Sequence, residues 1–414
     1  MNHLPDGERH EREFLTWLTE RISDYAHREV GQDALLVECG LDSVALLSLY
    51  GDIEAEFGSL IAPEDMWVYP TVRELARHLA VRRVRMSRRD RVRAVFVFVG
   101  QGSQHPGMAE GFYHHSTGYR DSLTRVDEVL RPYLGCSVAE LILSRDPGID
   151  RTSLAQPALF AVEYALARTL LDAGVRPVAV LGHGVGEFAA ATVAEALTLE
   201  QAARLVALRG EFMQRMPDSG GMLATCADPH EAAEVAASEP GVTIGAINAA
   251  RATVLSGDLD GLARVRNRLA DAGISSRLLP VAHAFHSPRM EPVVPKFTAV
   301  ARRFPGAQPR VPFFSTVYGR QLAEPLGAAY WARQITSPVR FAEAVRRMLA
   351  QHAPTHVVEI GPKIVLTPFL RRIGGADGPR CLAVCRGPES NAVDLAGVLS
   401  ALNAGPLAED TSEL

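Results

Sequence analysis

Residues 178–188 have the sequence Val-Ala-Val-Leu-Gly-His-Gly-Val-Gly-Glu-Phe and precede an alanine-rich run that ends at Leu197. The β-branched start predicts a buried strand, the glycines a sharp turn, and the alanine-rich run a helix. This strand, turn and helix can present a nucleophile above a sheet when the turn has the pattern G-x-S-x-G. Gly184 stands where the serine of that pattern would stand. The stretch therefore predicts an α/β core with a nucleophile turn that lacks its hydroxyl.

The composition is that of a globular protein with room for two or three domains. The chain has 414 residues, of which 47% are hydrophobic and 22% charged. It contains no apolar run of about 18 residues, and residues 1–14 lack the features of a signal peptide, so we expect no membrane span, no export and a cytoplasmic location. Five scattered cysteines predict reduced thiols rather than a metal site, although Cys381 and Cys385 are close in sequence.

Charge is unevenly distributed along the chain. Residues 1–80 hold 16 acidic residues and 6 arginines, a formal charge of −10, whereas residues 81–93 hold 7 arginines and one aspartate, a formal charge of +6. This pattern predicts a small acidic domain joined to a larger, nearly neutral one by an arginine-rich segment. The segment lacks aromatic residues, so we interpret it as a solvated linker or a helix extension and expect no nucleic-acid partner.

Hydrophobic periodicity in the acidic region predicts helices over residues 13–25, 44–57 and 71–79. The third helix starts near Thr71, and Glu74 follows three residues later, which is the pattern of a capping box. The region is therefore predicted to be a small all-α bundle. Ser43 stands at the start of the second helix, where it could simply be an N-cap.

Residues 13–80 resemble the acyl and peptidyl carrier protein family. The resemblance rests on Gly40-Leu41-Asp42-Ser43-Val44, which matches the motif G-x-D-S-[LV], and on the closing segment MWVYPTVRELA at 66–76. It implies a four-helix-type carrier bundle with 4′-phosphopantetheine attached to Ser43 by a phosphopantetheinyl transferase. The acidic charge agrees with this, because complementary charge steers protein partners.

Residues 94–401 predict an α/β core that contains a smaller inserted unit. Residues 94–99 are an apolar run typical of a buried strand, and the glycines of residues 100–104 predict a tight turn with exposed N–H groups. From residue 221 to residue 280 the pattern becomes β-α-β-β-α-β, which predicts a ferredoxin-like sheet. The core is predicted to return with strands at 311–317, 355–360 and 381–384 and a closing helix at 391–403.

This body resembles malonyl-CoA:acyl-carrier-protein transacylases and the acyltransferase domains of modular polyketide synthases. Six motifs occur in the order and at the spacing of that family. They are Gly100-Gln101-Gly102-Ser103-Gln104, Gln156-Pro157-Ala158-Leu159, Gly182-His183-Gly184-Val185-Gly186-Glu187, Leu208-Arg209-Gly210, His283-Ala284-Phe285-His286-Ser287 and Gly361-Pro362-Lys363. The resemblance implies a hydrolase-like core with a ferredoxin-like insert. It also implies acyl-CoA, carrier proteins and polyketide synthase modules as partners.

Acyl transfer between thioesters needs a nucleophile, a base and donors for the oxyanion. The resemblance assigns the nucleophile to the position of Gly184. It assigns the base to His286, oriented by the backbone carbonyl of Gln334. The oxyanion hole would consist of the main-chain N–H groups of Gln101 and Val185, the second at the start of a helix.

The resemblance implies substrate-binding roles for four further residues. Arg209 would grip a free carboxylate bidentately, which would select malonyl-type groups. Asn248 would line the same pocket. Phe285 would leave less room for a 2-substituent, since the sequence His-Ala-Phe-His accompanies malonyl preference in the family. His183 would pack and form hydrogen bonds within the turn.

Gly184 departs from the family pattern. Glycine has no oxygen, so no acyl-enzyme can form at this position and His286 loses the proton that it would take. Three explanations remain open. The natural enzyme has a serine and this chain is an engineered or trapped variant; or the chain is a natural pseudo-acyltransferase that serves as a scaffold for carriers; or His286 activates a phosphopantetheine thiol, or a water, for direct attack on a bound thioester.

We predict a carrier domain at residues 1–83, an arginine-rich linker at 84–93, an acyltransferase domain at 94–401 and a polar tail at 402–414. Within the acyltransferase domain the core would comprise 94–220 and 287–401, and the insert 221–286. The predicted function is acyl transfer from an acyl-CoA, with malonyl-type groups favoured, or from an acyl carrier, to the phosphopantetheine thiol of a carrier domain in polyketide-type secondary metabolism.

Overall fold

The computed structural model describes residues 6–39, 41, 43–57, 60–61, 65–90 and 92–404. The chain divides into two compact units, Met1–Arg91 and Val92–Leu414. Within the described ranges, no helix combines the length and the apolar character that crossing a membrane requires. The predicted tail lies mostly outside these ranges.

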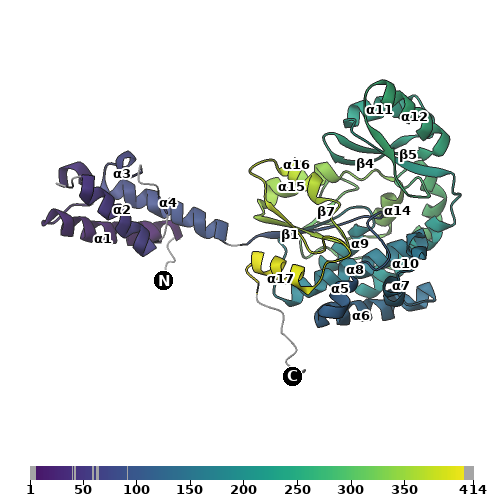
Figure 1. The fold of residues 1–414 in the computed structure, drawn as a ribbon, viewed down its shortest axis with the longest axis horizontal. Coiled ribbons are helices and arrows are strands. Elements are labelled where there is room, and N and C mark those ends of the chain that lie inside the picture. The colour runs from purple at the N-terminus through teal and green to yellow at the C-terminus, as the bar shows by residue number, and fades with distance from the viewer. Residues whose placement is uncertain are drawn as a thin grey trace. The chain divides into compact units, whose positions relative to one another are not determined.

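The first unit is a helical bundle (Figure 1). The apolar sides of its long helices form its core, which includes Phe14, Ile53 and Leu79. The helix predicted over residues 71–79 continues to Asp90, so most of the predicted linker at 84–93 is helical; arginine is a good helix former, which favours this extension. The elements are α1 (Asp6–Ala26), the 3-10 helix η1 (Leu36–Cys39), α2 (Ser43–Phe57), α3 (Asp65–Val68) and α4 (Val72–Asp90).

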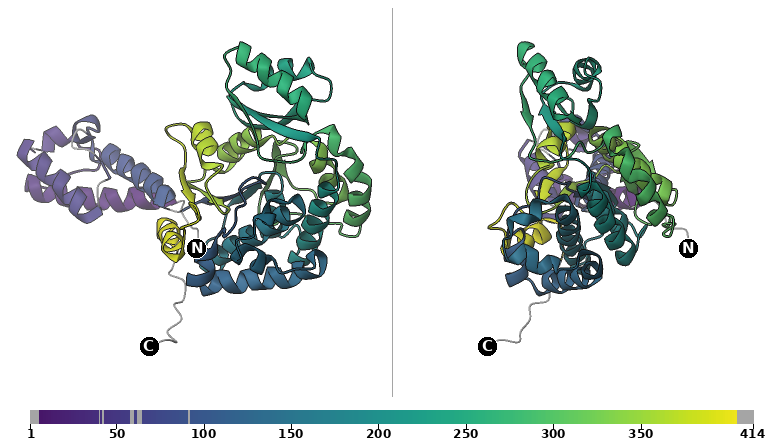
Figure 2. Two further views of the ribbon diagram at one scale, coloured as in Figure 1. Left: turned by 45° about the vertical axis from the view of Figure 1, so that its right-hand side comes forward. Right: turned by 90° about the vertical axis from the view of Figure 1, so that its right-hand side faces the viewer.

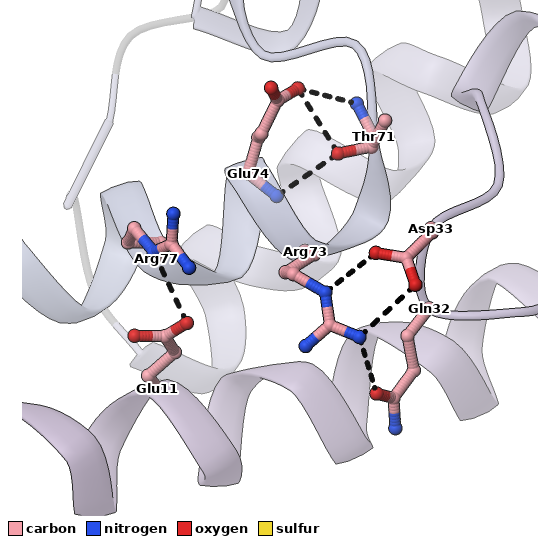
Figure 3. A network of polar contacts seen from close by, with 7 residues as sticks. All are labelled: Glu11, Gln32, Asp33, Thr71, Arg73, Glu74 and Arg77. Carbon is pink, nitrogen blue, oxygen red and sulfur yellow. Dashed lines mark hydrogen bonds and ion pairs between the residues drawn. The ribbon is translucent and has the colours of Figure 1, made fainter.

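Polar contacts hold the loop after α1 against the start of α4 (Figure 3). Arg73 donates from Nε to Asp33 Oδ1 at 2.6 Å and from Nη2 to Gln32 Oε1 at 3.1 Å. Thr71 N donates to Glu74 Oε2 at 3.3 Å, and Glu74 N donates to Thr71 Oγ1 at 3.2 Å, which is the expected capping box. These pairs are exposed, so each contributes little to stability. The Arg73 contacts hold the loop at Gln32 and Asp33 against α4.

The second unit is built on a six-stranded sheet with the order β10-β9-β1-β2-β7-β8 (Figures 1 and 2). Five strands are parallel, and β8 pairs antiparallel with β7. All residues of the inner strand β1 are buried, as expected for a parallel sheet with helices on both faces. Phe98 at the end of β1 pairs with Gly182 at the end of β2. The loops that follow these two strands therefore lie side by side.

Helices α8 and α9 cover one face of this sheet, and α15 covers the other. The strands are β1 (Ala94–Phe98), β2 (Ala179–Gly182), β7 (Phe313–Ser315), β8 (Arg320–Leu322), β9 (His356–Ile360) and β10 (Arg380–Ala383). The helices of this part are α5 (Glu110–His115), α6 (Thr117–Leu134), α7 (Val138–Leu143), η2 (Pro147–Asp150), α8 (Thr152–Asp172), α9 (Gly186–Val193), α10 (Leu199–Gln214), η3 (Pro288–Val293), α13 (Val294–Ala301), α14 (Ala328–Thr336), α15 (Phe341–His352), α16 (Thr367–Gly374) and α17 (Ala392–Ala401).

A second, four-stranded sheet is inserted between α10 and η3. Its strand order is β4-β5-β3-β6 with antiparallel pairing throughout, and its elements follow the predicted order β-α-β-β-α-β. Val339 joins it to the core, because Ile247 N donates to Val339 O at 2.8 Å and Val339 N donates to Gly245 O at 2.9 Å. The elements are β3 (Gly220–Thr225), α11 (Pro229–Ala237), β4 (Thr243–Ala249), β5 (Ala252–Asp258), α12 (Leu259–Asp271) and β6 (Ser276–Leu278).

Candidate active site

The turn between β2 and α9 holds position 184 at the carboxyl end of the six-stranded sheet. Close packing requires glycine on both sides of it: a Cβ on Gly182 would lie 2.2 Å from Glu187 N, and a Cβ on Gly186 would lie 2.2 Å from Val99 O. Gly184 has a φ of +56°, the left-handed region in which an L side chain is strained. The backbone therefore has the geometry of a nucleophile elbow.

His286 faces this elbow from the segment that leaves the inserted sheet. A Cβ on Gly184 would lie 3.2 Å from His286 Nε2, so a hydroxyl one bond further out could hydrogen-bond this nitrogen. His286 has a φ of +58°. Left-handed backbone at a residue other than glycine costs about 1–3 kcal/mol and clusters at functional sites. The chain thus keeps a strained histidine opposite a position that has no nucleophile.

The orientation of His286 is set by the carbonyl of Ser337, which lies 3.0 Å from His286 Nδ1. Our sequence prediction gave this role to the carbonyl of Gln334. That carbonyl also raises the His286 pKa, but the hydrogen bond is formed three residues later, where α14 has ended and the chain turns at its C-cap. A donor at Nδ1 leaves Nε2 as the acceptor in a neutral ring. Burial, together with the positive charge of Arg209, lowers the pKa of His286 to about 3, so the ring is neutral near pH 7.

The loop after β1 lies beside the elbow and supplies a second feature of the site. Ser103 Oγ donates to Gly100 O at 2.9 Å and fixes this loop. The backbone N–H groups of Gln101 in the loop and Val185 in the elbow form no hydrogen bond within the part of the chain that the structure describes. Backbone N–H groups that are free in this way can bind an oxyanion.

Arg209, on α10, is a buried cation at the same end of the unit. Its Nη1 donates to Gln156 Oε1 at 2.7 Å, and Gln156 Nε2 donates to Gln101 Oε1 at 3.1 Å. Its Nε has no hydrogen-bond partner among the described residues. Burial lowers the pKa of Arg209 to about 10, and the nearby Glu187 opposes that shift. A buried guanidinium with an unused donor can bind a carboxylate.

The three remaining candidate residues line the side of the elbow that faces the inserted sheet. His183 Nε2 lies 2.9 Å from Asn248 Oδ1, so this contact joins the elbow to β4. Burial lowers the pKa of His183, which favours a neutral ring. Phe285 is buried, and its carbonyl accepts a hydrogen bond from Ser256 Oγ at 2.6 Å. His183 and Asn248 therefore contact each other, while the buried Phe285 ring lies against the ring of His283.

Sequence analysis gave no role to Glu187, which is buried directly behind the elbow. Its oxygens accept hydrogen bonds from Thr316 N at 2.7 Å, Thr316 Oγ1 at 2.8 Å, Tyr330 Oη at 2.9 Å and Gln334 Nε2 at 3.2 Å. Gln334 Nε2 also donates to Gly184 O at 2.7 Å. Burial raises the pKa of Glu187 to about 7. A carboxylate at the start of an otherwise apolar helix was the available signal, since a buried charge requires partners.

In the first unit, Ser43 is the first residue of α2. The amino end of a helix favours a phosphate ester through its free N–H groups and its dipole. Position 43 therefore lies at the amino end of a helix. Asp42, which was expected beside it, lies outside the described residues.

Two parts of the chain match known protein families. Residues 95–393 match the family model described as acyl transferase domain, and residues 16–79 match the model described as phosphopantetheine attachment site. The second unit therefore has the mixed α/β fold of acyltransferases. The chain belongs to the acyl transferase domain family, in its polyketide synthase type, and also has a carrier domain. Domains of these two kinds use a CoA thioester as substrate and carry 4′-phosphopantetheine on a serine.

Several relatives are polyketide synthases. Polyketide synthase GfsB of Streptomyces halstedii is 39% identical over 303 residues, and mycoketide-CoA synthase of Mycobacterium tuberculosis is 41% identical over 273 residues. These matches cover 72% and 65% of this chain but only 5% and 6% of the two relatives. A loading acyltransferase from the avermectin modular polyketide synthase superposes with a TM-score of 0.71 at 34% identity, covering 75% of this chain and 100% of that structure. An acyl carrier protein S-malonyltransferase from Vibrio cholerae gives 0.67 at 26% identity, covering 74% and 99%.

Proposed function

We propose that the second unit binds a malonyl-type acyl-CoA, or an acyl carrier, and supports transfer of the acyl group to a carrier phosphopantetheine in polyketide-type biosynthesis. The observation that carries this proposal is the set of groups around position 184. A buried guanidinium, a neutral histidine and two free backbone N–H groups surround one elbow. They meet three needs of acyl transfer: recognition of a carboxylate, acceptance of a proton and stabilisation of an oxyanion.

We also propose Ser43 as the attachment site of the phosphopantetheine group in the first unit. A phosphopantetheinyl transferase would add this group from CoA. Its thiol would then accept an acyl group from the acyltransferase domain of the same chain or of another polyketide synthase module. The position of Ser43 at the start of α2 and the match to the attachment-site family support this assignment.

In the ordinary route of this family, a serine hydroxyl at position 184 would attack the carbonyl carbon of the thioester while its proton passes to His286 Nε2. The carbon–sulfur bond breaks, and the leaving thiolate takes the proton from His286. A carrier thiol then attacks the resulting ester, and the same proton transfers run in reverse order. Gly184 cannot form this ester, so the chain as it stands lacks that step.

A carboxylate on the substrate would strengthen His286 as a base. The positive charge of Arg209 is one cause of the low His286 pKa, after burial. A malonyl-type carboxylate paired with Arg209 would offset that charge and raise the His286 pKa. The residue that recognises the substrate would in this way also make the base more effective, which favours malonyl-type over simple acyl groups.

Direct transfer without an acyl-enzyme is a second candidate, favoured by the space beside His286. Apart from the adjoining chain, the atoms that the described residues place within 4 Å of a Cβ on Gly184 all belong to His286. A pantetheine thiol in this space could give its proton to Nε2 and attack the thioester carbonyl, after which the leaving thiolate takes that proton. Water in place of the thiol would give hydrolysis. A non-catalytic scaffold, by contrast, would bind the thioester without either reaction.

Loading of the carrier distinguishes these possibilities. The phosphopantetheinylated chain is incubated with malonyl-CoA, and intact mass reports malonyl transfer for the unsubstituted chain, Gly184→Ser and Gly184→Ala. We expect loading in Gly184→Ser to exceed that in Gly184→Ala by at least about 10³-fold, because only the serine supplies a nucleophile. Equal loading in the two variants would contradict the proposed route. Loading or hydrolysis by the unsubstituted chain that disappears in His286→Ala would establish the direct reaction instead.

A further inference from the structure

Glu187 connects three elements behind the elbow. It belongs to the first turn of α9, it accepts two hydrogen bonds from Thr316 just after β7, and it accepts one each from Tyr330 and Gln334 on α14. The carboxylate is fully buried. No substrate group is needed to explain these contacts, since both oxygens are fully used by the protein.

Helix α14 contacts both position 184 and His286. The Gln334 amide that donates to Glu187 also donates to the carbonyl of Gly184 at 2.7 Å. At the end of the same helix, Ser337 N donates to Arg333 O at 3.0 Å, and the Ser337 carbonyl lies 3.0 Å from His286 Nδ1. The elbow and the histidine are thus both attached to α14, and Glu187 attaches α14 to the elbow helix.

From these contacts we propose that ionised Glu187 is a positioning residue. It acts as a clamp between α9 and α14, which holds α14 against the elbow and thereby keeps position 184 and His286 in a fixed relative position. The consequence for acyl transfer rests on the proposed function. The consequence for the rigidity of the elbow does not, because it follows from the hydrogen bonds alone.

The donors around Glu187 favour its ionised form. The backbone N–H of Thr316 and the amide N–H of Gln334 can only donate, and they contact different oxygens of the carboxylate. The hydroxyls of Thr316 and Tyr330 can also accept a proton from the carboxyl group, because each has a second acceptor for its own hydrogen. Protonation therefore weakens these hydrogen bonds without removing the contacts, because hydrogen bonds to an ionised acceptor are the stronger ones. Of the titratable groups around it, Tyr330 on α14 is neutral because burial raises its pKa, and Arg209 on α10 is positive and favours the carboxylate. Since burial raises the Glu187 pKa to about 7, the strength of the clamp changes near neutral pH.

Hydrogen exchange on the full chain tests the clamp without any reaction. Glu187→Gln is isosteric, but it replaces an accepting oxygen with an NH₂ group that opposes a donor. We expect exchange of the amides at residues 183–188 and 330–338 to accelerate by at least about tenfold through local opening. Asp127→Asn is the matched control. Asp127 is another buried carboxylate, which lies on α6 away from the elbow and accepts hydrogen bonds from Ser137 Oγ and Val138 N. Unchanged exchange in Glu187→Gln, or equal acceleration in both variants, would overturn the proposal.

The pH profile of acylation tests whether ionisation of Glu187 supports the reaction. In the Gly184→Ser background, kcat/KM, which reports the free enzyme, should rise with pH through an inflection near 7. Glu187→Gln should abolish that inflection and lower kcat with little change in KM. His286, with a pKa of about 3 in the protein without substrate, titrates too low to produce it. Tyr330→Phe is the milder variant: it removes one donor to the carboxylate, so the inflection should move to higher pH. An inflection that persists in Glu187→Gln would overturn the proposal. Absence of any acylation in Gly184→Ser would instead contradict the proposed function and leave the exchange result decisive for the clamp.

Discussion

The elbow at Gly184 and the polar groups around it differ in their chemistry. Gly184 has no side-chain atom that could react, whereas Arg209 is a buried cation, His286 is neutral, and the backbone N–H groups of Gln101 and Val185 form no hydrogen bond among the described residues. Even the left-handed backbone of His286 is kept, although it costs free energy. The contacts that hold these groups do not involve a nucleophile at position 184, so the proposed recognition of a thioester and the covalent chemistry can be separated by a single substitution.

The largest expected effect concerns His286 once the hydroxyl is restored. In the Gly184→Ser background, His286→Ala should slow acylation by about 10²–10⁴-fold, because the hydroxyl then has no base to take its proton. Labelling with malonyl-CoA, quenched at a series of times, measures this rate. Arg289→Ala, close in sequence but exposed and bonded to Ser219 Oγ, is the control and should leave the rate nearly unchanged. An acylation rate that does not depend on His286 would contradict its proposed role as the base.

The next effect is on stability and concerns Glu187. Its pKa rises from 4.5 to about 7 on folding because the carboxylate is buried, so the folded state favours the protonated form. The stabilisation of the fold by this protonated carboxyl group is fully present below pH 4.5. It is lost as the pH rises through 7, which lowers the unfolding free energy by up to about 3 kcal/mol. The unfolding free energy of the second unit should therefore fall with pH in the unsubstituted chain relative to Glu187→Gln.

Denaturant unfolding at pH 5 and pH 8 measures this difference. The contribution of His286 is present in both proteins and cancels. If the difference in unfolding free energy between the two proteins is the same at both pH values, Glu187 does not titrate in the fold. If the unfolding free energy of the unsubstituted chain instead rises with pH relative to Glu187→Gln, the folded pKa of Glu187 is lowered rather than raised.

Arg209 should have an intermediate effect, on binding alone. Loss of a charge-assisted hydrogen bond costs about 1.5–3 kcal/mol, so Arg209→Gln should weaken binding of malonyl-CoA about 10–100-fold in the unsubstituted chain. Acetyl-CoA, which has no free carboxylate, is the internal control and should bind the two proteins similarly. Calorimetric titration measures the Kd of each of the two ligands for each of the two proteins. Equal losses for both ligands would assign Arg209 to the fold rather than to carboxylate recognition.

The smallest expected effect isolates the strain of the elbow. Gly184→Ala should destabilise the second unit by about 1–2 kcal/mol, because an L residue is placed in left-handed backbone. Gly135→Ala is a matched comparison, since Gly135 has a φ of +70° at the end of α6 and its Cβ would meet no atom within 4 Å. Thermal unfolding should show a somewhat larger loss at Gly184, where the Cβ approaches His286 Nε2. A smaller loss at Gly184 would mean that the elbow relaxes around a side chain.

Much of the architecture could be predicted because it follows local periodicity. The apolar strands, the order of the inserted sheet and the long helices all leave patterns that repeat every two or about 3.6 residues. Strand β8 was missed, since Arg320–Leu322 is short, partly exposed and has no such pattern. The extension of α4 to Asp90 was left open between linker and helix, because arginine suits both.

The candidate site was predictable only in part, for a different reason. Gly184, His286, Arg209 and Gln101 were identified through motifs, and the structure brings their surroundings together from four separate segments. The groups that hold them are not encoded locally: Ser337 acts through its carbonyl, which any residue has, and the partners of Glu187 come from 129 to 147 positions further along the chain. Contacts of this kind follow from tertiary packing, so hydrophobic periodicity gives no sign of them.

A hydroxyl introduced at position 184 gives the decisive measurement. Gly184→Ser on a Ser43→Ala background is incubated with malonyl-CoA, and intact mass is followed by peptide mapping, with Gly184→Ala on the same background as control. We predict a malonyl adduct on the peptide that contains position 184 in the serine variant, and no adduct in the alanine variant. No adduct in a folded serine variant that still binds malonyl-CoA, or an adduct elsewhere in the second unit, would contradict the conclusion that the elbow lacks only its nucleophile.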